Sequence, residues 1–148
     1  MLIAGGKHLE KWKLSAARLG LANRATFLWT INDLVPYYSA ADAYVHPTFY
    51  DPCSLVLLEA AASGLPIVTT RRSNGAAELF QEGAEILIAN EPTDLAALCE
   101  RIDGLFDEAA RKTLGAAARS VAMQHPFEKN VAEILQLYDA RSRSRTAA

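Results

Sequence analysis

The chain has 148 residues, of which 51% are hydrophobic and 22% are charged, and its formal net charge is -2. This composition is typical of one globular domain with a single core, and it excludes a disordered chain. Because basic residues are not in excess, the charge balance disfavours a nucleic-acid partner.

The first part of the chain alternates short apolar runs with helical periodicity. Its predicted elements are a strand at 2–4, a helix at 9–19, a strand at 25–29, a short helix that contains Pro36, and a strand at 43–46. Gly5-Gly6 forms a turn after the first strand, and Gly20 ends the first helix. The first strand has the apolar pattern of an inner strand with almost nothing before it. We therefore interpret the chain as a piece of a longer protein.

The same alternation continues to the C-terminus. We predict a helix at 54–62 closed by Gly64 and Pro66, a strand at 67–70, a short helix at 76–80, a strand at 86–88, and three final helices. The three helices carry apolar stripes that we interpret as core faces: Leu95, Leu98, Ile102 and Leu105; Ala110, Leu114, Ala117 and Val121; Val131, Ile134, Leu135 and Tyr138. Repeated βα units predict an α/β, Rossmann-like parallel sheet with helices on both faces, which binds ligands at the carboxyl ends of its strands.

Cysteine and histidine spacing and the hydropathy of the chain bear on metal binding and on the cellular compartment. Cys53 and Cys99 lie far apart, and the three histidines do not cluster, so we expect no metal site and a reducing cytoplasm. Neither a signal peptide nor a membrane-spanning run is found. The domain is expected to cover residues 1–140, and the arginine-containing residues 141–148 are expected to form a flexible tail without a function.

The segment from His46 to Ala60 combines a strand end, a loop and a helix start. Pro52 suits the first helical position, where its missing N–H costs little. The free amides of Cys53, Ser54 and Leu55 would then point out of the helix as an anion site, suited to a diphosphate. Cys53 itself has no base close to it in sequence, so we favour a role as a small wall residue over that of a nucleophile.

Two carboxylates lie around that helix start, Asp51 before it and Glu59 inside it. They can hold the two ends of a long ligand. Alternatively, Asp51 is an N-cap and Glu59 a solvated residue of the helix surface, and the spacing alone favours this structural interpretation.

The surrounding residues resemble the C-terminal domain of the family 4 glycosyltransferases, which have the GT-B fold of two facing Rossmann-like domains. The family pattern is Glu, seven residues and Glu, then a helix end of small residues and Gly-Leu-Pro before a strand. This chain has Asp51-x7-Glu59, Ala60-Ala61-Ala62-Ser63-Gly64-Leu65-Pro66 and Ile67-Val68, flanked by matches at 38–47 and 74–78. Among relatives, bacterial lipopolysaccharide core glucosyltransferases look most similar.

The resemblance implies a role for each matching position in binding a nucleotide sugar. Glu59 would hydrogen-bond the ribose, Asp51 the transferred sugar, and the Ser54 and Leu55 amides the diphosphate. Thr30 and Ile31 would pack against the base, and the turn Gly5-Gly6 would let the backbone approach the phosphates. Asp51 stands where the family usually has Glu, and Ser54 where it usually has Gly.

Other parts of the family's site have no counterpart in this chain. The basic pair that neutralises the diphosphate would lie upstream of Met1, acceptor contacts would come from an N-terminal domain, and Lys7 and Arg71 are only the nearest basic candidates. The resemblance therefore implies retaining transfer, from a UDP-sugar by preference, by a longer cytoplasmic protein with possible peripheral membrane association. Its acceptor would be a glycan or lipopolysaccharide, no metal or other cofactor is expected, and this chain alone would be inactive.

Two other hypotheses compete with the transferase. In the first, the chain is a non-catalytic binding or assembly module that pairs with another chain or with its own copy, through an exposed surface that includes Phe127 and Tyr138. In the second, it is a plain dinucleotide-binding fold, which is disfavoured because no Gly-x-Gly-x-x-Gly follows a predicted strand.

Overall fold

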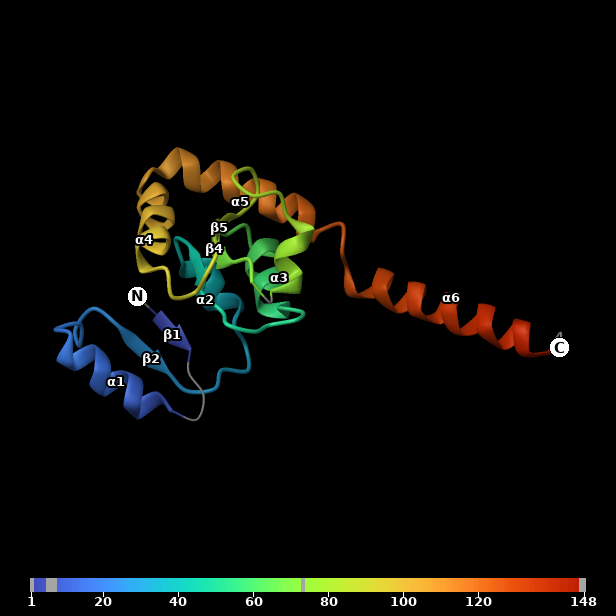
Figure 1. The fold of residues 1–148 in the computed structure, drawn as a ribbon, viewed down its shortest axis with the longest axis horizontal. Helices are drawn as coiled ribbons and strands as arrows, with labels where there is room; N and C mark the ends of the chain where they lie inside the picture. The colour runs from blue at the N-terminus through green and yellow to red at the C-terminus, as the bar shows by residue number, and fades with distance from the viewer. Residues whose placement is uncertain (1, 5–7, 73, 147–148) are drawn as a thin grey trace. The chain divides into compact units, whose positions relative to one another are not determined.

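Short parallel strands alternate with helices along the chain, as the sequence pattern predicts (Figure 1). The structure, a computed structural model, describes residues 2–4, 8–72 and 74–146. Contacts divide the chain into two units, residues 1–37 and residues 38–148. The predicted turn Gly5-Gly6 and Lys7 lie outside the described residues.

The first unit contains β1 (Leu2–Ala4), α1 (Leu9–Arg18) and β2 (Thr26–Leu28). β1 and β2 pair in parallel, with Leu2 opposite Thr26. α1 ends at a left-handed glycine, Gly20, with φ of 72°. The amides of Gly20 and Leu21 donate to the carbonyls of Ala17 and Ala16. This is the Schellman pattern that closes a helix, so the predicted stop at Gly20 is confirmed.

The second unit contains a three-stranded parallel sheet in the order β3-β4-β5. Its elements are α2 (Val35–Ala40, which begins in the first unit), β3 (Tyr44–His46), α3 (Leu55–Ala62), β4 (Ile67–Thr70), η1 (Gly75–Leu79), β5 (Leu87–Ala89), α4 (Leu95–Asp103), η2 (Gly104–Phe106), α5 (Glu108–Ala122) and α6 (Phe127–Thr146). All four residues of β4 are buried. Because successive side chains point to opposite faces, the central strand is covered on both sides, as predicted for a parallel α/β sheet.

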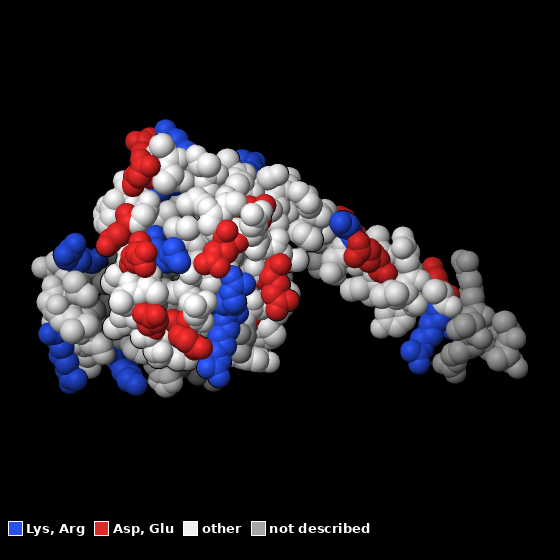
Figure 2. Space-filling model, turned by 45° about the horizontal axis from the view of Figure 1, so that its top comes forward, with Lys and Arg blue, Asp and Glu red and all other residues white. Residues whose placement is uncertain are grey.

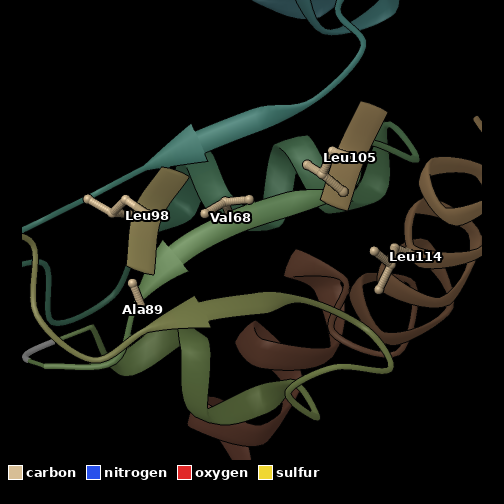
Figure 3. Packing of buried hydrophobic residues seen from close by; sticks show 5 residues of the cluster. All are labelled: Val68, Ala89, Leu98, Leu105 and Leu114. Atoms are coloured by element: carbon tan, nitrogen blue, oxygen red, sulfur yellow. The ribbon is translucent and has the colours of Figure 1, made fainter. Parts of the chain in front are cut away.

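The core of the second unit forms where two helices pack on this sheet. Val68 of β4 and Ala89 of β5 pack with Leu98, Leu105 and Leu114, which come from α4, η2 and α5 (Figure 3). The apolar stripes predicted at 95–105 and 110–121 supply these leucines, so both stripes contribute to the core, as expected. Leu95 is an exception because it is 71% exposed.

A tight turn after α3 brings that helix close to α5. Gly64 has φ of 79°, and the amides of Gly64 and Leu65 close a second Schellman turn on Ala61 and Ala60. A Cβ at Gly115 of α5 would lie 2.1 Å from the carbonyl oxygen of Gly64. Glycine at position 115 therefore lets α5 reach the end of α3.

Two helices differ from the sequence prediction. α3 begins at Leu55, with Ser54 as its N-cap, so Pro52 is not its first residue but part of a turn before it. α6 extends to Thr146, into the segment predicted as a tail. Its described side chains, through Arg141, are exposed, so the stripe predicted at 131–138 is not a core face here. Phe127 and Tyr138 are exposed, as the assembly hypothesis expects.

Candidate functional site

Two buried threonines of β4 fix the loop that leads from β3 to α3. β3 ends at His46, which lies opposite Thr69 in the parallel register. The Thr69 hydroxyl donates to the His46 carbonyl at 2.9 Å. The Thr70 hydroxyl donates to the carbonyl of Thr48 at 2.8 Å and accepts from its amide at 3.2 Å. The loop therefore leaves the carboxyl end of the sheet along a defined path.

The backbone of Asp51 is held by the segment after β4. Asp51 forms a parallel bridge with Asn74, and the Gly75 amide donates to the Asp51 carbonyl at 3.2 Å. A Cβ at Gly75 would lie 2.2 Å from the carbonyl oxygen of Pro52. Only glycine permits this approach without a shift of the loop, so Gly75 fixes where Asp51 lies relative to the sheet.

The side chain of Asp51 contacts a histidine that the sequence analysis did not assign to the site. Asp51 Oδ2 lies 3.1 Å from His46 Nε2, and both side chains are 25% exposed. Since Ser54 is the N-cap of α3, the alternative interpretation of Asp51 as that cap is wrong. The carboxylate instead faces a ring at the end of β3.

Ser54 occupies the position where the resembling family usually has glycine. It is 1% exposed, and its hydroxyl makes no capping hydrogen bond. The hydroxyl lies 3.5 Å from His46 Nε2. The extra side chain is thus buried toward His46. Because α3 begins at Leu55, its unpaired amides start there, and the amide of Cys53 lies outside the helix. The side chains of Cys53 and Leu55 are exposed.

Glu59 lies on α3 and keeps its carboxylate accessible. The residue is exposed, and its Oε2 accepts a hydrogen bond of 3.1 Å from the Tyr38 hydroxyl. The same hydroxyl lies 3.4 Å from the Val56 carbonyl. Burial raises the pKa of Tyr38 well above its ordinary value, and the hydrogen bond to Glu59 and the charge of Glu59 raise it further. Tyr38 is therefore a neutral donor that orients Glu59 while leaving it open to solvent.

Tyr44 connects the surroundings of the two carboxylates. Its ring stacks on His46 with centroids 5.8 Å apart and meets Tyr38 edge-on at 6.1 Å. Burial raises the pKa of Tyr44 to about 12, and the charges of Asp51 and Glu59 add to this effect. The charges of both carboxylates thus raise the pKa of the same phenol. Tyr38, Tyr44 and His46 lie in the segment whose match to the family was noted from sequence, but that match gave them no role.

A buried amide lies at the same edge of the sheet. Asn74 is 2% exposed, and its Nδ2 donates to the Thr69 hydroxyl at 2.8 Å. Within the described residues, its Oδ1 is buried without a hydrogen-bond partner. A buried acceptor of this kind calls for a donor such as a bound water.

Other predicted site residues lie elsewhere. Thr30 and Ile31 follow β2 in the first unit, where Thr30 is exposed and Ile31 half-buried. Arg71, a candidate for the diphosphate, forms an ion pair with Glu82. Acidic and basic residues are interspersed on the face shown in Figure 2.

The described residues offer neither a group of metal ligands nor a membrane-spanning helix. Among the described residues, no three His, Cys, Asp or Glu side chains are grouped so that they could hold a metal ion. None of the helices in those residues is long and apolar enough to cross a membrane.

Comparison with known proteins decides the family. The model of the family described as "Glycosyl transferases group 1" matches residues 1–121. The chain belongs to this family. The resemblance to the C-terminal domain of family 4 glycosyltransferases noted in the sequence is thereby confirmed.

Individual relatives show how much of a group 1 glycosyltransferase this chain represents. It is 30% identical over 141 residues to the D-inositol 3-phosphate glycosyltransferase of Corynebacterium jeikeium, a match that covers 92% of this chain and 33% of that protein. It is 33% identical over 70 residues to the lipopolysaccharide glucosyltransferase WaaG of Escherichia coli, covering 47% of this chain and 19% of WaaG. The chain thus spans about a third of the first of these relatives.

Solved structures confirm the fold. Sucrose-phosphate synthase from Thermosynechococcus elongatus is 29% identical with a TM-score of 0.86, and the match covers 97% of this chain and 38% of that one. Anabaena HepE, crystallised with UDP-glucose, is 24% identical with a TM-score of 0.75, covering 91% of this chain and 40% of HepE. At this identity the HepE match supports the fold alone.

Proposed function

We propose that this chain is the donor-binding domain of a glycosyltransferase that transfers a sugar from a nucleotide diphosphate sugar, with a UDP-sugar favoured. The observation that carries the proposal is the placement of two carboxylates around the start of α3. Asp51 lies just before the helix, and the exposed Glu59 lies on it, oriented by Tyr38. Between them in sequence are the unpaired amides that begin at Leu55, which suit a diphosphate.

In this proposal Glu59 accepts hydrogen bonds from the ribose and Asp51 from hydroxyls of the transferred sugar. The amides of Ser54 and Leu55 bind the diphosphate with Cys53 beside them, and the roles of Thr30 and Ile31 toward the base and of Gly5-Gly6 toward the phosphates rest on the sequence resemblance alone. No metal or other cofactor is required. Hydroxyl groups recognised by carboxylates give strong, charge-assisted hydrogen bonds, so the two acids would dominate recognition.

The proposed reaction proceeds with retention. The bond from the anomeric carbon to the diphosphate oxygen breaks, and the acceptor oxygen bonds to the same face of the sugar. The acceptor proton passes to the departing diphosphate oxygen, so no protein nucleophile is needed. The protein then contributes positioning and stabilisation of charge. Because the acceptor site would lie in an N-terminal domain, we expect this chain to be inactive alone.

The proposal also covers the acceptor, the membrane association and the compartment of the complete protein. The similarity to WaaG supports a glycan or lipopolysaccharide acceptor, for which the complete protein would associate peripherally with a membrane. The free cysteines Cys53 and Cys99, both exposed, suit a reducing cytoplasm.

Calorimetry with UDP and with UDP-glucose tests the proposed donor site. We expect the wild-type chain to bind both, and Glu59→Ala to weaken both by about tenfold, the effect of losing a hydrogen bond to a charged group. Glu100→Ala is the matched control, because Glu100 is also exposed and lies on α4. Absent binding in the wild type, or equal binding by wild type and Glu59→Ala, would contradict the proposal.

Exposure of α6 favours a second candidate function, an assembly module. Phe127, Leu135, Leu137 and Tyr138 are all more than half exposed. A second copy of the chain, or a separate N-terminal domain, would cover such residues. Light scattering across a dilution series separates the candidates, since a strict monomer would contradict self-assembly and leave the donor-binding proposal unaffected.

A further inference from the structure

The imidazole of His46 lies between a phenol and a carboxylate. Its Nδ1 is 3.5 Å from the Tyr44 hydroxyl, and its Nε2 is 3.1 Å from Asp51 Oδ2. The Tyr44 ring stacks on the imidazole with an interplanar angle of 16°. The ring is therefore restrained on its face and at both nitrogens.

The hydrogen-bond partners indicate which nitrogen carries the proton. The Asp51 carboxylate can only accept a hydrogen bond, so Nε2 carries the proton and donates to Asp51 Oδ2. A neutral imidazole with its proton on Nε2 accepts at Nδ1, here from the Tyr44 hydroxyl, which can donate or accept. A carboxylate accepts several hydrogen bonds, so Asp51 retains capacity for another donor.

The backbones of His46 and Asp51 are both anchored to residues at the end of β4 or just after it. The His46 carbonyl accepts from Thr69, whose hydroxyl accepts from Asn74 Nδ2, and both of these residues are almost fully buried. The Asp51 carbonyl accepts from the Gly75 amide. Thr69, Asn74 and Gly75 thus set the distance from the end of β3 to the loop, and the side-chain contact spans a fixed gap.

We propose that His46 is a positioning residue that holds the Asp51 carboxylate ready for the hydroxyls of the donor sugar. The inference rests on the proposed function, in which Asp51 contacts that sugar. An aspartate at a partly exposed loop would otherwise lose side-chain freedom on binding, and a preformed orientation removes that cost. It also gives the short side chain at position 51, where relatives usually have the longer Glu, one defined direction.

The sugar increment, defined as the ratio of the dissociation constants for UDP and UDP-glucose, tests this role. His46→Phe keeps a flat ring for stacking on Tyr44 but removes both nitrogens. We expect it to weaken UDP-glucose binding by about three- to tenfold, as expected for a lost positioning contact, and to leave UDP binding within about twofold. His46→Gln, which keeps an N–H donor, should retain more of the increment than His46→Phe.

His125→Phe is the matched control, since His125 is exposed and lies just before α6. It should leave both constants unchanged. Equal weakening of UDP and UDP-glucose by His46→Phe would indicate a merely structural role and overturn the inference, as would no change in either. A wild type that binds no nucleotide would overturn the proposed function itself, which separates the two failures.

Nitrogen-15 NMR of the histidine rings provides a second measurement that needs no ligand. We expect His46 to be the Nε2–H tautomer in the wild type at neutral pH, and both Asp51→Asn and Tyr44→Phe to shift its ring nitrogens. An Nδ1–H tautomer, or ring nitrogens that ignore Asp51→Asn, would overturn the inference even if His46→Phe failed to fold.

Discussion

The carbonyl oxygen of Pro52 lies only 2.2 Å from the position that a Cβ atom would take on Gly75. This contact joins the loop before α3 to the segment after β4. It lies beside the bridge between Asp51 and Asn74 and the hydrogen bond from Gly75 to Asp51. The position of the proposed sugar-binding carboxylate therefore depends on the absence of a side chain 24 residues further along the sequence.

Gly75→Ala is predicted to damage the site and the fold together. The added methyl group must displace the loop, because the atom that it meets belongs to the backbone. We expect a loss of about 1–3 kcal/mol in the free energy of unfolding, as for other overpacked sites, and weaker UDP-glucose binding. Urea denaturation and calorimetry measure the two effects.

Gly104→Ala is the control for Gly75→Ala, since a Cβ there meets nothing within 4 Å and its φ is -59°. It should leave stability unchanged or slightly raised, because alanine restricts the unfolded chain. If both variants behaved alike, the close approach of Gly75 to Pro52 would not exist in solution.

Local sequence predicted the helix ends that a glycine closes, but not the start of α3. Gly20 and Gly64 could be assigned as stops because a left-handed residue after a helix is a local requirement, and both have positive φ. Pro52 suits the first helical position by its sequence context, but it lies in a turn before α3. Its position is set by Gly75, and a contact between distant segments leaves no periodic pattern in the sequence.

In the site, too, the residues that belong to a local motif could be predicted, whereas those that depend on contacts between distant segments could not. Asp51 and Glu59 were identified through a motif whose spacing is local. His46 and Tyr38 were not assigned to the site, because their contacts depend on how the loop and α3 fold back over β3. The stripe of α6 shows the limit of periodicity, which identifies an apolar face but not what covers it.

Leu98→Ala is predicted to destabilise the second unit. Leu98 is 6% exposed and packs in the cluster around Val68 and Ala89. Removing its side chain leaves a cavity between α4 and the sheet, and we expect a loss of about 2–5 kcal/mol in the free energy of unfolding. Leu95→Ala on the same helix is the control, because Leu95 is 71% exposed and should cost less than about 0.5 kcal/mol. Comparable losses for the two leucines in urea denaturation would contradict the described packing of α4.

Tyr44 is predicted to make the fold sensitive to alkali. Burial, reinforced by the charges of Asp51 and Glu59, raises its pKa from 10.0 to about 12. Between these two values the unfolded chain releases the Tyr44 proton while the folded chain keeps it. The folded state then binds more protons, so stability is fully present below pH 10 and falls as the pH rises toward 12.

The slope of the unfolding free energy between pH 10 and 12 measures this effect. Tyr44 should contribute a fall of at most about 1.4 kcal/mol per pH unit, and Tyr44→Phe should make the slope shallower by that amount. Some slope should remain in this variant, because the pKa of Tyr38 is also raised. Tyr50→Phe is the control, since Tyr50 is 75% exposed and should not alter the slope. If Tyr44→Phe left the slope unchanged, the phenol would not be buried beside the two carboxylates. The Tyr44 hydroxyl would then not be in place to donate to the His46 ring.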